Sequence, residues 1–153
     1  MEASELDWID CYGADNGLAY ATTLGGTAPY TFVWDNGQWT GDTINALTPG
    51  LHIVVVTDAK GCTATDTVFT HEPAELTIAI DNAQTVFAYC IGVNTASLTG
   101  IALGGTPGYS YQWNDNAVNP QTTATASSLL AGVYTITVTD TKGCTASDFR
   151  DID

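Results

Sequence analysis

The chain has very few positive charges. Only 3 of its 153 residues are Lys or Arg, against 17 Asp or Glu, and the formal net charge is −14. A surface this acidic repels phosphate backbones and anionic lipid headgroups, which excludes nucleic acid and anionic membrane surfaces as partners. Charged residues make up only 13% of the chain, about half the usual share. Thr, Ser, Asn and Gly supply most of the polar surface instead, a composition typical of a secreted β protein.

Histidine and long apolar runs are scarce as well. The two histidines are His52, in an apolar segment, and His71, in a junction, whereas a serine or cysteine nucleophile needs a positioned base. We therefore expect no enzymatic activity. No run approaches the ~18 apolar residues that span a bilayer, and the first residues lack the regions of a signal peptide. We expect no membrane insertion, and for an exported protein we expect the signal to lie outside this sequence.

A long internal repeat is what the chain does contain. The segment LHIVVVTDAKGC at 51–62 returns as VYTITVTDTKGC at 133–144. Trp34 returns as Trp113, and Cys11 as Cys90, each 79 positions later. Because self-similarity at a long period indicates repeated structural units, the sequence predicts two domains, at 1–74 and 75–153.

Four cysteines, one pair in each domain, predict two disulfides. Domains of this size bury a modest fraction of their surface and are marginally stable without cross-links. Matched placement pairs Cys11 with Cys62 and Cys90 with Cys144, and each bridge would stabilise its domain by roughly 4 kcal/mol in the chain-entropy model. The alternative is four free thiols in a reducing compartment. The matched placement favours the disulfides and an oxidising compartment.

Alternating apolar and polar residues predict strands, and no segment has helical periodicity. Leu6–Cys11 is predicted as the first strand, and Tyr30–Trp34 alternates cleanly before Asn36-Gly37, a strong hairpin-turn signal. Many short strands between Gly/Pro turns predict an all-β chain of two tandem immunoglobulin-like (PKD-like) β-sandwich domains.

Alignment of the two copies predicts which side chains of the strand Leu51–Thr57 point into the core. His52, Val54 and Val56 fall on the inward set, because the second copy has Tyr134, Ile136 and Val138 there. Ile53 and Val55 then face outward, which indicates either a covered sheet or a docking surface.

Tryptophan is the candidate residue for contact with a ligand. Trp34 and Trp113 occupy the same inward position and are predicted core residues, and Trp8 aligns with Phe87 and is predicted buried too. Trp39 has no aromatic counterpart in the second copy and stands in a glycine-flanked hairpin beside Asp42. Trp39 and Asp42 are therefore the candidate carbohydrate-binding residues. The alternative is a Trp39 ring that folds over its own sheet edge.

Loops rich in Asp and Asn raise the question of a metal. Carboxylate and amide oxygens are the ligands that calcium prefers, but no loop matches the EF-hand spacing, and solvated acidic loops are the alternative. No cofactor is predicted, with calcium left open at these loops. Asp58 and Asp140 are predicted instead to cap their turns by accepting backbone N–H bonds from two residues on. The loops in question are Asp15-Asn16, Asp81-Asn82 and Asn114-Asp115-Asn116.

Three motifs of the first copy together resemble a known family. They are GG-x-x-P-Y at 25–30, W-x-N-G at 34–37 and V-T-D-x-K-G-C at 56–62. The combination is similar to the SprB-type repeat of the long surface adhesins of gliding bacteria. The resemblance implies an immunoglobulin-like sandwich, export by the type IX secretion pathway of such bacteria, and extracellular display in tandem on the bacterial cell surface. Neighbouring repeats or a surface polysaccharide are the partners it implies.

Two functions follow as expectations. The first is a non-catalytic, monomeric stalk segment of a secreted adhesin, made rigid because the junction His71–Glu75 lacks the Gly/Ser run of a flexible linker. The second is a carbohydrate-binding module of an extracellular polysaccharide-acting protein.

Overall fold

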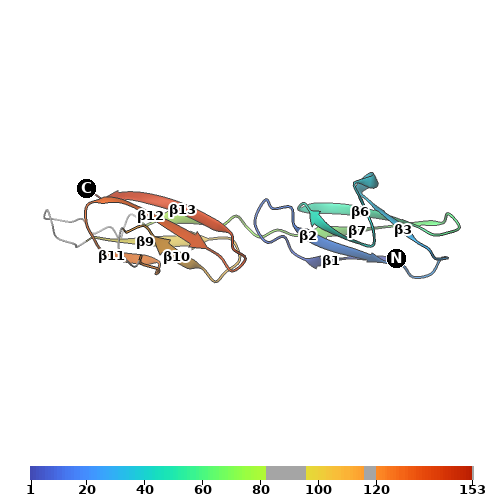
Figure 1. Cartoon of the computed structure of the whole chain (residues 1–153), viewed down its shortest axis with the longest axis horizontal. Coiled ribbons are helices and arrows are strands. Elements are labelled where there is room, and N and C mark those ends of the chain that lie inside the picture. Colours follow the sequence, from blue (N-terminus) through green and yellow to red (C-terminus); the bar gives the residue numbers. More distant parts are fainter. Residues whose placement is uncertain (82–95, 116–119, 153) are drawn as a thin grey trace. The chain divides into compact units, whose positions relative to one another are not determined.

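The computed structural model describes residues 1–81, 96–115 and 120–152. The chain divides into two compact units, unit 1 (Met1–Pro73) and unit 2 (Ala74–Asp153), where the sequence predicted a boundary between residues 74 and 75. Apart from the short 3-10 helix Asp35–Gly37, every regular element in these ranges is a strand (Figure 1). No helix among them is long and apolar enough to cross a membrane.

Unit 1 is a sandwich of two antiparallel sheets. One sheet has the order β1-β2-β5 and the other the order β4-β3-β6-β7. Its strands are β1 (Glu2–Asp7), β2 (Gly17–Thr22), β3 (Thr31–Trp34), β4 (Trp39–Thr40), β5 (Thr43–Leu47), β6 (Gly50–Thr57) and β7 (Thr63–Thr70).

Unit 2 repeats this architecture. Its sheets have the orders β11-β9-β8 and β10-β12-β13. The predicted class, an all-β chain of immunoglobulin-like sandwiches, is confirmed. The strands of unit 2 are β8 (Thr77–Ile80), β9 (Ala96–Leu103), β10 (Ser110–Trp113), β11 (Thr125–Leu129), β12 (Gly132–Thr139) and β13 (Thr145–Ile152).

The first strand lies earlier than the sequence predicts. β1 covers Glu2–Asp7, so the prediction of a strand at Leu6–Cys11 is wrong. The polar residues of β1 conceal it in the sequence, because an edge strand needs little apolar surface to pair. Its pairing with β2 places Glu2 opposite Thr22, and a register shift follows between Glu5 and Asp7.

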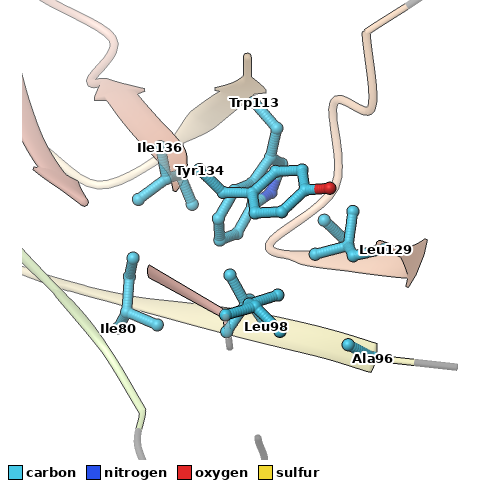
Figure 2. Packing of buried hydrophobic residues seen from close by; sticks show 9 residues of the cluster. Ile80, Ala96, Leu98, Trp113, Leu129, Tyr134 and Ile136 are labelled. Carbon is cyan, nitrogen blue, oxygen red and sulfur yellow. The ribbon is translucent and has the colours of Figure 1, made fainter. Parts of the chain in front are cut away.

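A buried tryptophan stands at the centre of each core. Trp34 is 0% exposed and Trp113 is 1% exposed, which confirms both core predictions. Each indole Nε1–H donates to a backbone carbonyl, Trp34 to Gly41 at 2.9 Å and Trp113 to Thr123 at 3.0 Å. These bonds satisfy the polar atom of a ring that is otherwise packed in apolar surroundings. Figure 2 shows Trp113 among the other side chains of the unit 2 core.

The long strand β6 faces as the sequence predicts. His52, Val54 and Val56 are buried, Ile53 is exposed and Val55 is half-buried. The predicted turn at Asn36-Gly37 is also present, with positive φ at Asn36 (58°) and Gly37 (103°). Both results follow from local rules, the two-residue period of a strand and the backbone freedom of Asn and Gly.

Candidate functional site

The Asp-x-Lys-Gly turn is built identically in the two units. Asp58 Oδ1 accepts hydrogen bonds from Lys60 N at 2.8 Å and Cys62 N at 2.9 Å. Asp140 Oδ1 does the same for Lys142 N and Cys144 N, both at 2.9 Å. The other carboxylate oxygen, Oδ2, accepts a backbone N–H from an earlier loop in each unit. Asp58 Oδ2 accepts from Thr27 N at 3.0 Å, and Asp140 Oδ2 accepts from Thr106 N at 2.8 Å. The predicted capping role is confirmed.

These bonds also set the acidity of the two carboxyl groups. The pKa of Asp58 is lowered by backbone hydrogen bonds, chiefly those from Cys62 and Thr27. For Asp140 the largest single effect is burial, which raises the pKa, but the N–H bonds from Thr106, Cys144 and Lys142 together outweigh it and lower the pKa. Hydrogen bonds to the charged form stabilise that form. Both carboxylates therefore serve the fold and have little capacity left for a ligand.

His52 is a structural residue. It is 4% exposed, its Nδ1 lies 2.5 Å from Asp35 Oδ2, and its Nε2 lies 2.9 Å from the carbonyl oxygen of Thr48. Asp35 Oδ1 also accepts from Ile53 N at 2.8 Å. The core position predicted for His52 is confirmed, and both ring nitrogens are engaged within the fold.

Unit 2 satisfies the same positions with an uncharged pair. Tyr134 replaces the histidine, and its hydroxyl donates to Leu130 O at 3.1 Å. Asn114 replaces the aspartate, and its Oδ1 accepts from Thr135 N. Because neutral residues at these two positions make the corresponding backbone hydrogen bonds in the second copy, the His52–Asp35 contact in unit 1 is a variant of core packing.

Trp39 folds partly over its own sheet. It pairs with Trp34 across β3 and β4, packs against the unit 1 core, and meets the His52 ring edge-to-face at a centroid distance of 6.2 Å. Asp42 is exposed and borders an open hollow of about 550 Å³ whose lining does not include Trp39. The role of Trp39 and Asp42 in ligand binding stays a prediction.

The predicted disulfide between Cys11 and Cys62 is wrong. Cys11 is disulfide-bonded, but Cys62 is a free, exposed thiol. Cys62 directly precedes β7, whereas the loop of Cys11 lies beside the residues that follow β7, since Gly13 N donates to Glu72 Oε2 at 2.7 Å. Eight residues of β7 separate these ends by roughly 26 Å, and a disulfide requires Cα atoms within about 7 Å.

The cysteines of unit 2 are described in part. Cys144 is disulfide-bonded. Cys90, the partner predicted for it, lies outside the described residues.

Aromatic rings gather on the surface of unit 1. The Trp8 and His71 rings stack at a centroid distance of 5.2 Å and an interplanar angle of 25°. Phe69 meets the edge of His71 at 5.0 Å and lies opposite Leu51 across the β6–β7 pair. All four side chains are exposed, Trp8 by 59%. We call this surface the aromatic patch, defined by Trp8, Leu51, Phe69 and His71.

Glu5 holds the patch in place. Its carboxylate accepts the backbone N–H of His71 at 2.7 Å and lies 2.8 Å from His71 Nδ1. The ring of His71 is thereby fixed as the platform on which Trp8 stacks. A cluster of exposed rings with a polar anchor can pack against a sugar ring or an apolar protein surface.

The sequence did not predict this patch. The prediction that Trp8 is buried is wrong, because Trp8 lies beyond the end of β1 and only the following residue, Ile9, enters the interior. Phe87, with which Trp8 was aligned, lies outside the described residues. The alternation in β7, where Val68 and Thr70 are buried, was the signal that Phe69 faces outward.

The described residues contain no group of three or more His, Cys, Asp or Glu side chains arranged to hold a metal ion. Of the loops proposed for calcium, Asn82 and Asn116 lie outside the described residues. Asn16 is engaged with Asp10, to which its side-chain amide donates at 2.6 Å. The expectation of no cofactor, with calcium left open at these loops, stays a prediction.

Comparison with solved structures finds similar chains at low sequence identity. A C-terminal 282-residue fragment of intimin, in complex with the intimin-binding domain of Tir, is 17% identical over 99% of this chain and 63% of that chain, with a TM-score of 0.49. Murine CEACAM1b is 16% identical over 99% of each chain, with a TM-score of 0.36. The four N-terminal Ig domains of Dscam1 isoform 6.44 are 12% identical over 92% of this chain, with a TM-score of 0.41. The chain spans 41% of that Dscam1 fragment.

Family comparison agrees with the repeat seen in the sequence. No curated protein matches the chain. The model of the SprB repeat matches it twice, at residues 9–38 in unit 1 and at residues 83–118 in unit 2. The predicted resemblance is confirmed, because the SprB repeat model matches one segment in each unit.

Proposed function

We propose that this chain is a structural and adhesive repeat segment of a large, secreted bacterial surface adhesin of the gliding-motility type. It acts outside the cell as a non-catalytic and rigid stalk. The observation that carries the proposal is the repetition of one unit, because two SprB matches fall on two sandwiches with the same capped turn. Stacked copies of one module are the usual way to build an extended surface protein.

The chemistry of the described residues supports a non-catalytic role. His52 is buried with both ring nitrogens engaged. His71 is tied to Glu5 and stacked on Trp8. A general base must instead be free to reach a substrate proton.

The aromatic patch supports the adhesive part of the proposal. Large rings such as Trp8 are enriched where proteins bind one another, and exposed apolar clusters mark interaction surfaces. In unit 2 the counterparts of Leu51 and Phe69 are Val133 and Asp151, which face each other across β12 and β13. The counterpart of Trp8, Phe87, lies outside the described residues. We expect the patch of unit 1, where the four side chains are described, to contribute to adhesion.

A carbohydrate-binding module is the second candidate function. The exposed stack of Trp8 on His71 favours it, because a flat, anchored ring surface is suited to stacking against a sugar ring. On this reading a polysaccharide ligand would lie on the aromatic patch rather than at Trp39.

One set of variants tests both candidates. Beads coated with the chain are expected to attach to a target surface, and Trp8→Ala should reduce attachment several-fold while Trp39→Ala leaves it unchanged. A glycan array probed with the same three proteins distinguishes the functions. If no glycan binds and attachment still depends on the patch, the adhesin stalk is supported. Glycan binding abolished by Trp8→Ala supports the module, and attachment indifferent to Trp8→Ala contradicts a role for the patch.

Surface display is tested separately. Antibodies raised against the chain should label intact cells that produce the parent protein. Labelling that appears only after the cells are lysed would contradict the extracellular location.

A further inference from the structure

Unit 1 contains a small cavity, of about 130 Å³, beside the turn that Asp58 caps. Eleven residues line it, and at nine of these positions unit 2 has the same residue type. We call this cavity the Gly25–Gly26 groove. Its main walls are Gly25, Gly26, Tyr30 and Asp58. Their counterparts in unit 2 are Gly104, Gly105, Tyr109 and Asp140.

The walls have the same internal bonds in both units. The Tyr30 hydroxyl donates to Gly25 O at 2.9 Å, and the Tyr109 hydroxyl donates to Gly104 O at 2.5 Å. The glycines share a left-handed backbone, with φ of 93° at Gly25 and 75° at Gly104. The groove is therefore already formed in unit 1.

In unit 2 a peptide segment fills this place. Ala74 O accepts a hydrogen bond from Gly105 N at 2.8 Å. The carbonyl oxygen of Glu75 lies only 1.9 Å from the point where a Cβ of residue 104 would stand. Leu76 packs against Gly105, at 3.2 Å from its hypothetical Cβ, and is 8% exposed. Only glycine at position 104 leaves room for this segment.

None of the residues that the structure describes occupies the same place in unit 1. Among the described residues, a Cβ at Gly25 would meet no atom within 4 Å, and the three atoms nearest to a Cβ at Gly26 belong to the groove's own Asp58 and Tyr30. Asp58 is correspondingly half-buried, while Asp140 is buried. The two grooves thus have matching walls, one filled and one open.

The strand register shows from which direction the groove is filled. Ala3 N donates to Asp66 Oδ2 and Ile80 N donates to Asp148 Oδ2, both at 2.9 Å, so Ala3 and Ile80 are equivalent. Met1 is then equivalent to Ile78. Leu76 stands two residues before Ile78, so the matching leucine in unit 1 would stand two residues before Met1.

We propose that the Gly25–Gly26 groove binds the segment that would connect a preceding copy of the repeat to unit 1, an extended Ala-Glu-Leu peptide that enters from the N-terminal side of β1. The absence of a side chain at Gly25 lets the peptide carbonyl pass, the Gly26 N–H donates to the peptide, and the leucine fills the apolar part beside Val56. This interaction joins one repeat to the next and does not depend on what the protein adheres to.

The test adds the junction to the full chain. The sequence of residues 71–77, HEPAELT, is placed directly before Met1, which puts its leucine in the required register. The control carries serine in place of that leucine. Hydrogen exchange followed by mass spectrometry reports the stability of residues 1–73 separately from that of residues 74–153.

The leucine extension is expected to lower the equilibrium constant for opening of unit 1, measured by hydrogen exchange, by about tenfold or more relative to the serine control, because it buries a leucine side chain. Alkylation of Cys62, which lines the groove, should slow in parallel. In a Gly25→Ala background the added methyl group blocks the peptide, so both extensions should then behave alike. Equal exchange and equal Cys62 alkylation for the leucine and serine extensions in the unmutated background would overturn the proposal.

Discussion

Gly104→Ala should destabilise unit 2 far more than the equivalent change destabilises unit 1. A Cβ at residue 104 would lie 1.9 Å from the carbonyl oxygen and 2.8 Å from the carbonyl carbon of Glu75. Both atoms belong to the backbone, so a side-chain rotation cannot relieve the overlap. The segment that carries Leu76 must move out of its groove.

Three losses contribute to the expected magnitude. Alanine in the left-handed conformation that Gly104 adopts, with φ of 75°, costs about 1–2 kcal/mol. Exposure of Leu76 costs about 1.5–3 kcal/mol, and loss of the bond from Gly105 N to Ala74 O about 0.5–1.5 kcal/mol. The free energy of unfolding of unit 2 should therefore fall by about 3–6.5 kcal/mol.

Gly25→Ala is the matched control. Gly25 also has a left-handed backbone, with φ of 93°, but a Cβ there would meet nothing within 4 Å. Only the backbone cost of about 1–2 kcal/mol remains. Hydrogen exchange in urea, read separately for residues 1–73 and 74–153, measures both variants. Equal losses for the two substitutions would refute the reasoning, because they would show that the contact with Glu75 contributes nothing.

Three further outcomes are expected. Asp35→Ala removes an acceptor from the buried His52 ring and should lower the free energy of unfolding of unit 1 by about 1–3 kcal/mol, measured in urea. The double change Asp35→Asn with His52→Tyr introduces the two residues of unit 2 and should restore most of this loss. A double variant as unstable as Asp35→Ala would contradict the equivalence of these positions in the two units. The pKa of Asp140 is lowered in the folded chain. The stabilisation by its carboxylate is therefore complete above the unfolded pKa of about 3.9 and is lost as pH falls through the folded pKa. The midpoint of urea unfolding should drop between pH 5 and pH 2, and it should drop by less in Asp140→Asn. Alkylation of the native, unreduced chain, followed by peptide mapping, should place label on the peptide that carries Cys62, and that peptide should carry none in Cys62→Ser. A native chain without label at Cys62 would show that its thiol is not free.

The predictions that succeeded rest on short-range rules. The facing of His52, Val54 and Val56 follows from the two-residue period of a strand, and the capping by Asp58 and Asp140 follows from bonds to residues two positions away. The inward place of Trp34 follows from the same alternation. None of these results required knowledge of which strands are neighbours.

The predictions that failed depended on distant parts of the chain. The pairing of Cys11 with Cys62 assumed that matched positions lie close in space, yet the length of β7 separates them. The burial of Trp8 was inferred from its alignment, but β1 ends at Asp7 and Trp8 stacks on His71, 63 positions further along the chain. A single sequence contains no signal for such contacts.

The amino-acid sequence by itself determined the repeat, the strand facing and the capped turns, because hydrogen bonding and side-chain alternation act over a few residues. Only the tertiary structure decided that Cys62 stays free, which rings form the aromatic patch, and that a groove with matching walls is filled by Leu76 in one unit and open in the other. These features depend on where strands end and what passes beside them, and distances of that kind are set only when the sheets pack.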